Sequence, residues 1–181
     1  MAAEMPQELA YDTTRTEMPE EIKDWMYKYW LPRLVAELLK GIRELCPDEL
    51  RDQILMRMGN ACAPIAIEGI GIKPGMGLEA YKEYMASLSS PIGPRTIECE
   101  GDILYHSYHA PKGKDGRPMC MCVLAQLGIE EPSIELCRCC AAPVVGHLTE
   151  TGTGRSVTKV ENLGAPPSGE EACRFRVHLE P

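Results

Sequence analysis

Several features that would assign a function class are missing from this sequence. The basic residues are scattered and the net charge is −8, whereas binding to nucleic-acid phosphates needs a cluster of Lys and Arg. The first residues contain neither a basic segment nor an apolar segment, so they do not form a secretory signal. No apolar run is long enough and free enough of charge to span a bilayer. The sequence therefore disfavours nucleic acid and membranes as partners and predicts a soluble, cytoplasmic protein.

Other patterns are absent too. The ferredoxin spacing Cys-x2-Cys-x2-Cys does not occur, which disfavours a ferredoxin-like electron carrier. The sequence shows no internal repeat and no low-complexity tract. A disulfide framework is disfavoured because the nine cysteines are odd in number and the predicted compartment is reducing. The cysteines are therefore expected to be ligands, nucleophiles or buried apolar residues.

Hydrophobic periodicity predicts helices in the first half of the chain. From Pro19 onward, apolar residues recur at steps of three and four, and Pro32 is expected to kink or restart this helix. A second helix begins after Pro47, and Gly59 is placed to end it. A glycine-rich loop then leads to a short helix over 78–88.

The second half has the alternation that is typical of strands. Two strands are expected on either side of a turn at Gly101, and two more over 155–161 and 173–179. Ser133 is expected to cap a helix that runs through the cysteines of 137–140. The predicted fold class is α+β, with N-terminal helices packed on a mostly antiparallel C-terminal sheet that carries one long helix.

A chain of 181 residues, 44% of them hydrophobic, can build one ordinary core. We expect a loose N-terminal arm over 1–18 and a single α+β domain over 19–181. The helical part of this domain is expected over 19–90 and its cysteine-rich sheet part over 95–181.

The cysteines carry the strongest chemical signal. On an extended backbone Cys120 and Cys122 point to the same face, whereas the thiols of 137–140 spread around a helix, so that only one or two of them could be ligands. Cys173 begins the last strand. Thiolates from separate elements indicate a shared metal site, with zinc as the first choice and an iron–sulfur cluster as the alternative. A redox-active dithiol set and plain burial of the thiols remain open.

The histidines give a weaker signal. His106 and His109 would face opposite sides of a strand, which disfavours joint metal binding. A surface or partly buried structural role is expected for both.

The C-terminal part resembles a known family. The resemblance rests on the order and spacing of Leu136-Cys137-Arg138-Cys139-Cys140, Gly146, Gly154-Arg155-Ser156-Val157, Val160-Glu161 and Gly169-Glu170-Glu171-Ala172-Cys173-Arg174-Phe175. Over roughly 120–179 it is similar to the 4-vinyl reductase domain, and its Cys-x-Cys pairs also resemble L-2-amino-thiazoline-4-carboxylic acid hydrolase-like cysteine-rich proteins.

This resemblance implies a small-molecule-binding domain with zinc beside an apolar pocket. It adds Glu161 to the expected ligands, together with Cys173 and one of the three cysteines in 137–140. The candidate metal ligands are therefore Cys120, Cys122, Cys137, Cys139, Cys140, Glu161 and Cys173.

Three functions compete at this point. The first is a small-molecule-binding domain with a cysteine-ligated metal. The second is a small-molecule hydrolase that uses metal-bound water or a thiolate, for which Cys122 and Cys139 are the candidate nucleophiles. The third is an iron–sulfur or dithiol redox protein. The expected partner is a small-molecule ligand or substrate, and a homodimer is left open.

Overall fold

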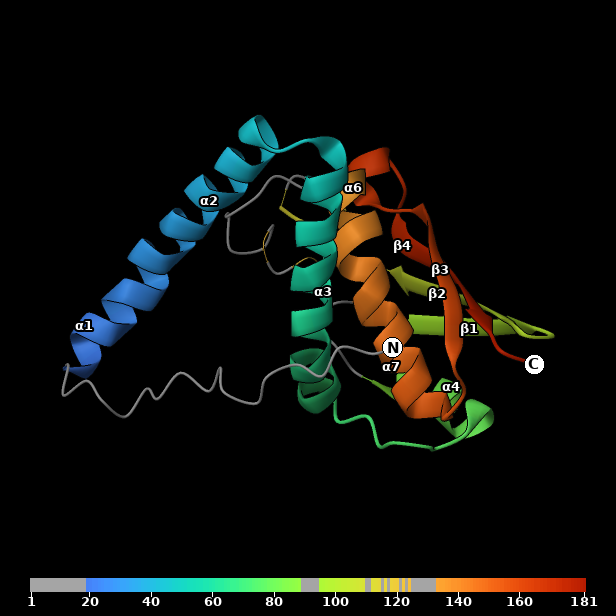
Figure 1. Ribbon diagram of the computed structural model, residues 1–181. Coiled ribbons are helices and arrows are strands. Elements are labelled where there is room, and N and C mark those ends of the chain that lie inside the picture. The colour runs from blue at the N-terminus through green and yellow to red at the C-terminus, as the bar shows by residue number, and fades with distance from the viewer. Residues whose placement is uncertain are drawn as a thin grey trace.

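The computed structural model describes residues 19–88, 95–109, 112–114, 116, 118–120, 122, 124 and 133–181. The expected loose arm over 1–18 lies outside these residues. The described elements are, in chain order, α1 (Glu20–Trp25), η2 (Met26–Trp30), α2 (Leu31–Leu45), α3 (Asp48–Ile70), α4 (Leu78–Ser87), β1 (Arg95–Glu100), β2 (Ile103–His109), α6 (Ile134–Leu136), η3 (Cys137–Ala141), α7 (Ala142–Thr153), β3 (Val157–Gly164), η4 (Pro166–Ser168) and β4 (Ala172–Leu179). Helices and one four-stranded antiparallel sheet confirm the α+β class (Figure 1). Within the described ranges, no helix has the length and apolar character needed to cross a membrane.

The sheet has the strand order β1-β2-β4-β3, and all neighbouring strands are antiparallel. α4 and α7 pack on its inner face, and α3 packs on α7 from the outside (Figure 1). Because side chains alternate along a strand, β4 turns Cys173, Phe175 and Val177 inward and Arg174 outward. The main core lies between this inner face and the two helices.

α3 is longer than the sequence predicts. Gly59, which was expected to end it, lies in its interior, and the helix continues through Pro64 to Ile70, where Gly71 in the left-handed conformation follows it. A β-carbon on Gly59 would lie only 2.4 Å from the carbonyl oxygen of Cys140 in η3. The prediction of a helix end at Gly59 was wrong, because this glycine serves the close approach of two helical segments.

A proline follows each of the two π-helical segments, η2 and η3. Pro32 and Pro143 are the second residues of α2 and α7, which continue the chain from these segments. Proline has no N–H to donate to the carbonyl four residues earlier, which belongs to Lys28 and Cys139 respectively. The wider π turn carries the helix past the missing hydrogen bond. Pro143 thereby shapes the turn that holds the run of cysteines.

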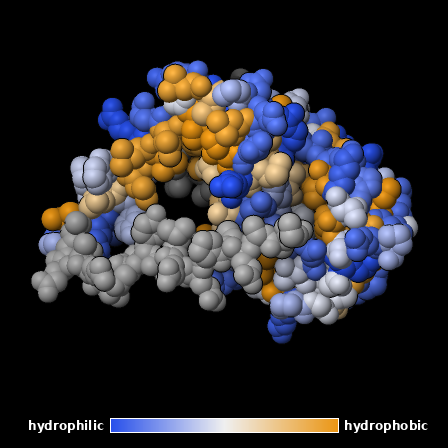
Figure 2. All heavy atoms as spheres, viewed as in Figure 1, coloured by the Kyte–Doolittle hydropathy of each residue, from blue (hydrophilic) through white to orange (hydrophobic). Residues whose placement is uncertain are grey.

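α1, η2 and α2 follow one another as a single helical arm, residues 20–45, that leans away from the rest of the molecule (Figure 1). α1 and η2 contain no buried residue. In α2, Val35, Leu39 and Ile42 join a second, smaller core with Leu55 and Met58 of α3. Apolar side chains also lie along the surface of the arm (Figure 2).

Candidate functional site

The register of three strands places a cation, a phenol and a thiol in one row on the inner face. Arg95 of β1 pairs with Tyr108 of β2, which pairs with Cys173 of β4. All three side chains are buried. The guanidinium of Arg95 lies over the Tyr108 ring, 5.7 Å from its centroid, at the distance of a cation–π contact.

His106 lies beside this row, because it is the inward-facing residue of β2 that precedes Tyr108. It is only 1% exposed, so the expectation of a surface or partly buried position was wrong. The Thr149 hydroxyl donates to the carbonyl oxygen of Val145 at 2.8 Å and therefore accepts from His106 Nε2 at 3.2 Å. His106 Nδ1 then accepts from the Tyr108 hydroxyl, 3.4 Å away. Burial lowers the pKa of His106 to about 3, so the imidazole is neutral in the folded protein.

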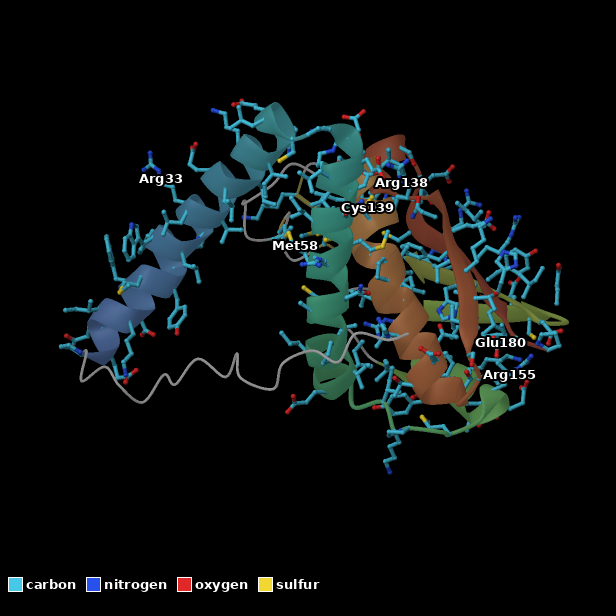
Figure 3. The ribbon with its side chains drawn as sticks, viewed as in Figure 1. Arg33, Met58, Arg138, Cys139, Arg155 and Glu180 are labelled. Atoms are coloured by element: carbon cyan, nitrogen blue, oxygen red, sulfur yellow. The ribbon has the colours of Figure 1, made fainter. Side chains whose placement is uncertain are left out.

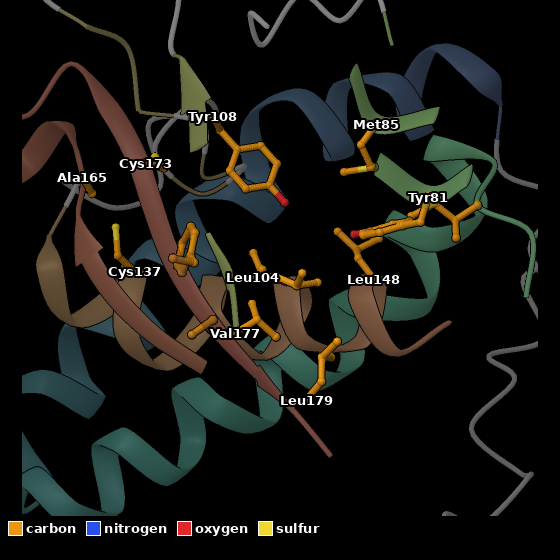
Figure 4. Close-up of a cluster of buried hydrophobic side chains, with 14 residues drawn as sticks. Tyr81, Met85, Leu104, Tyr108, Cys137, Leu148, Ala165, Cys173, Val177 and Leu179 are labelled. Carbon is orange, nitrogen blue, oxygen red and sulfur yellow. The ribbon is translucent and has the colours of Figure 1, made fainter. Parts of the chain in front are cut away.

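Tyr81 of α4 covers this group and is fully buried. Its hydroxyl meets no hydrogen-bond partner among the residues that the structure describes. Burial raises the pKa of Tyr81 to about 12, and the Thr149 hydroxyl, which lies near the Tyr81 hydroxyl without a hydrogen bond of ordinary geometry, and the charge of Arg95 only partly oppose this shift. Figure 4 shows the hydroxyls of Tyr81 and Tyr108 directed into the same part of the interior. We call Tyr81, Arg95, His106, Tyr108 and Thr149 the interior polar group.

Seven of the nine thiols gather at the Cys173 end of the same row. Each lies close enough to another for its charge to shift the neighbour's pKa, and they come from α3, the segment before α6, η3 and β4. Figure 4 shows two of them, Cys137 and Cys173, at one end of the core. This thiol cluster consists of Cys62, Cys120, Cys122, Cys137, Cys139, Cys140 and Cys173.

Burial and repulsion by neighbouring thiols raise the pKa of Cys62, Cys120, Cys137 and Cys140. Burial, and after it the neighbouring thiols of the cluster, raise the pKa of Cys137 to about 12. The same two causes raise the pKa of Cys140 to about 12, and its Sγ donates a hydrogen bond to the Leu55 carbonyl oxygen at 3.2 Å. Thiols in this state are neither nucleophiles nor metal ligands until they lose their protons.

The thiols do not form a ready metal centre. Among the described residues, no three His, Cys, Asp or Glu side chains are arranged to hold a metal ion. The turn of η3 separates its cysteines, because Cys137 packs in the main core whereas Cys139 and Cys140 pack in the second core with Leu39 and Leu55. As arranged here, the set does not fit a tetrahedral thiolate site, and zinc and the iron–sulfur cluster stay predictions.

Glu161 lies away from the thiols. Its carboxylate accepts from Lys159 at 2.7 Å and from His178 Nε2 at 2.8 Å, and Arg176 lies 3.5 Å from it. The hydrogen bonds from Lys159 and His178 lower its pKa to about 2. Its partners project from the outer face of the sheet, whereas Cys173 points inward. The structure therefore does not bring Glu161 together with the other expected ligands.

The two candidate nucleophiles occupy different surroundings. Cys139 is buried in the second core, and burial raises the pKa of its thiol even though the Arg138 guanidinium opposes the shift. Arg138 itself donates to Asp52 of α3 at 2.7 Å, which ties η3 to that helix (Figure 3). Cys122 is partly buried and belongs to the thiol cluster. With its buried side chain and raised pKa, Cys139 has the properties of a residue that packs in the core.

Apart from His106, the residues of the interior polar group were not predicted from the sequence as candidate site residues. A usable signal is present in β2, where Leu104 marks the inward positions and places His106 and Tyr108 on the same face. No local pattern could have added Thr149, which is 43 residues away from its partner His106 in the chain.

Comparison with known proteins gives matches to 12 chains of solved structures. Neither a family model nor a curated protein matches the sequence. Among solved structures, the chain is similar to a trafficking protein particle complex subunit 3 from Naegleria fowleri covalently bound to palmitic acid, with a TM-score of 0.48 and 11% identity. That match covers 87% of this chain and 97% of the other. Similarity at this level assigns neither a function nor a ligand to this chain.

Proposed function

We propose that this chain is a soluble cytoplasmic protein that binds a small molecule at the interior polar group. The observation that carries the proposal is the buried Tyr81 hydroxyl, which meets no partner among the described residues. An unsatisfied buried hydroxyl costs stability, and a ligand with a hydrogen-bonding group would remove that cost. The four polar or charged residues that are buried in the described ranges belong to this part of the core; they are Arg95, His106, Thr149 and Thr153.

The surroundings indicate the class of ligand. Met85, Leu104 and Phe175 belong to the same buried core as the interior polar group, in which Arg95 carries a positive charge and the Tyr81 hydroxyl makes no hydrogen bond of ordinary geometry among the described residues. Small-molecule sites typically combine apolar walls with a few convergent polar groups. The expected ligand is therefore a compact apolar molecule that carries a carboxylate or a phenol. The nine cysteines form no disulfide, which agrees with the reducing cytoplasm in which such a protein would work.

Tyr81→Phe tests this proposal with benzoate and phenol as probes. Without a probe, the variant is expected to be at least as stable as the wild type, because it removes an unsatisfied buried hydroxyl. With benzoate or phenol at about 100 times its dissociation constant, the wild type gains about 2.7 kcal/mol of stability, and Tyr81→Phe loses most of this gain. Thermal denaturation with and without each probe measures both effects.

Tyr105→Phe is the matched control. Tyr105 is on the outer face of β2, where the Arg176 guanidinium lies 5.6 Å from its ring centroid, so the loss of its hydroxyl should leave probe binding unchanged. A wild type that neither probe stabilises, or a Tyr81→Phe variant that keeps the full gain, would contradict the proposal.

Soft-metal binding at the thiol cluster is a second candidate function. The thiols of the cluster raise one another's pKa values, because their negative charges would repel each other. A bound cation would offset this repulsion, and this supports the candidate. Zinc would have to displace the thiol protons and draw the side chains together, so binding should release protons and raise the melting temperature.

Zinc titration under anaerobic conditions tests this candidate. Cys137→Ser should reduce zinc binding strongly, since the charges of four other thiols act on Cys137, whereas Cys46→Ser, outside the cluster, should not. Proton release and metal content by mass spectrometry are the measurements. A structural site would bind about one equivalent of zinc. If the wild type binds less than about 0.2 equivalents, this function is excluded.

A further inference from the structure

The interior polar group is closed off from solvent. All five of its side chains are buried, and Tyr81, His106 and Thr149 are 1% exposed or less. A small molecule therefore reaches these side chains only when an element that covers them moves aside. Lids and loops that open and close commonly serve this purpose in ligand sites that exclude water.

Among the described elements around this group, α4 can move without breaking the rest of the fold. β1, β2 and β4 are joined by antiparallel ladders along nearly their whole lengths. α7 packs on α3 and also on β3 and β4, so its displacement would open the main core (Figure 1). α4 is ten residues long and contacts β1 and α7. Its displacement would leave the sheet and the packing of α3 on α7 in place.

Two side chains of α4 reach into the core beside the interior polar group. Tyr81 and Met85, one helical turn apart, are both 0% exposed. Figure 4 shows both extending into the core from one side, with Leu148 beside Tyr81. The Tyr81 ring lies directly on α7, because a β-carbon at Gly152 would lie only 2.2 Å from its Cδ2 atom. The ring takes this position only because residue 152 has no side chain.

The loop that precedes α4 has the properties of a hinge. Gly71 follows the last residue of α3 and Gly77 precedes the first residue of α4, with φ angles of 78° and 85°. Glycine adopts these and many other backbone conformations at low cost. Hinges are formed by a few such positions in loops or at the ends of elements.

Two hydrogen bonds at the edge of α4 hold it in the closed position. The Tyr84 hydroxyl donates to the carbonyl oxygen of Ile70, the last residue of α3, at 2.8 Å. In the connecting loop, the Gly75 N–H donates to the Thr151 carbonyl oxygen of α7 at 2.8 Å. Each bond contributes little net stability, because water can replace it when α4 moves away.

We propose that α4 is a lid that swings on the loop over 71–77 and admits the small molecule to the interior polar group, an inference that rests on the proposed function. Closure and binding are coupled, because Tyr81 belongs to both the lid and the site. When the empty site is closed, the Tyr81 hydroxyl makes no hydrogen bond of ordinary geometry among the described residues. A ligand that supplies a partner therefore binds the closed state better and shifts the lid toward it.

Amide hydrogen exchange of the full chain, followed by mass spectrometry, tests whether α4 opens by itself. Without a ligand, the amides of α4 are expected to exchange at least about 10-fold faster than those of α7 and β2, because the rest of the protein stays folded. Tyr84→Phe removes one of the two hydrogen bonds and should speed exchange in α4 about 3–10-fold, with α7 unchanged.

Ser87→Ala is the matched control for Tyr84→Phe. The Ser87 hydroxyl donates to the Tyr84 carbonyl oxygen within α4 itself, so its loss should leave exchange over 78–84 unchanged. If α4 exchanges no faster than α7 and β2, or if Tyr84→Phe speeds all three alike, α4 opens only when the whole protein unfolds. Either result overturns the proposal.

Gly152→Ala should push the lid open from the side of α7. The new methyl group occupies the place of the Tyr81 ring, so exchange in α4 should rise at least about 5-fold. Gly146→Ala is the control in the same helix, because its β-carbon would meet Val160 of β3 at 3.1 Å and should leave α4 unchanged. If Gly152→Ala fails to fold, the milder Tyr84→Phe decides the question.

Benzoate and phenol distinguish a failure of the lid from a failure of the proposed function. At about 100 times its dissociation constant, a probe that has to leave when the lid opens should slow exchange in α4 about 100-fold. A probe that raises the melting temperature but leaves exchange in α4 unchanged overturns the lid alone. If neither probe raises the melting temperature, the proposed small-molecule function is overturned, and the lid's role in admitting a ligand is overturned with it.

Discussion

Gly59→Ala is expected to lower the melting temperature by about 6–12 °C. The new β-carbon would lie 2.4 Å from the carbonyl oxygen of Cys140 and 3.1 Å from two further backbone atoms of that residue. Backbone atoms cannot rotate away as a side chain can, so α3 and η3 must move apart. Such overpacking costs about 3 kcal/mol, and each kcal/mol shifts the melting temperature of a chain of this size by about 2–4 °C. Thermal and urea denaturation both measure the effect.

Gly41→Ala provides the matched control. It is the same substitution inside a helix, but a β-carbon at Gly41 meets nothing within 4 Å. Alanine should therefore stabilise α2 by about 0.5–1 kcal/mol through the lower backbone entropy of the unfolded chain. If Gly59→Ala were as harmless as Gly41→Ala, the close packing of α3 on η3 would be wrong, and with it the position of Cys140 beside Leu55.

Acid is expected to destabilise the protein through His106 before any carboxylate contributes. Between pH 6.5, the usual value for histidine, and about pH 3, the unfolded chain carries a proton on this imidazole and the folded protein does not. The unfolded state then binds more protons, so the free energy of unfolding rises with pH across this interval and falls on acidification. The slope approaches about 1.4 kcal/mol per pH unit, and a change from pH 6.5 to 4.5 should cost about 2–3 kcal/mol.

Glu161 contributes in a lower interval. Its pKa is about 2 in the folded protein against 4.5 ordinarily, so the stability that it supplies is present above pH 4.5 and is lost as the pH falls toward 2. Between pH 6.5 and 4.5, the change in the free energy of unfolding therefore reports on His106 and not on Glu161.

His106→Gln removes the titration while it keeps a donor for Thr149 and an acceptor for Tyr108. Urea denaturation at several pH values should show that this variant loses about 2–3 kcal/mol less than the wild type between pH 6.5 and 4.5. His109→Gln, at the exposed end of β2, should follow the wild type. Equal slopes for His106→Gln and the wild type would show that His106 is reached by protons in the folded state.

The sequence by itself determined the periods of the elements and several of their ends. The steps of three and four along α2, the acidic first turn of α3 and the Ser133 cap, which accepts from the Leu136 N–H at 3.2 Å, are local features. The turn at Gly101 between β1 and β2 is local too. Such features depend on neighbours within a few residues, so propensity and capping chemistry suffice to predict them.

The tertiary structure decided what the local signals could not distinguish. A glycine in a helical pattern can end the helix or let another backbone approach, and only the position of Cys140 shows that Gly59 does the second. A histidine in a strand can face either side, and only the packing of α7 on the sheet places Thr149 against His106. The thiols follow the same rule, because the spacing of cysteines in the chain does not fix their directions around the η3 turn. Long-range contacts bring segments together that share no local pattern, and these contacts built the interior polar group.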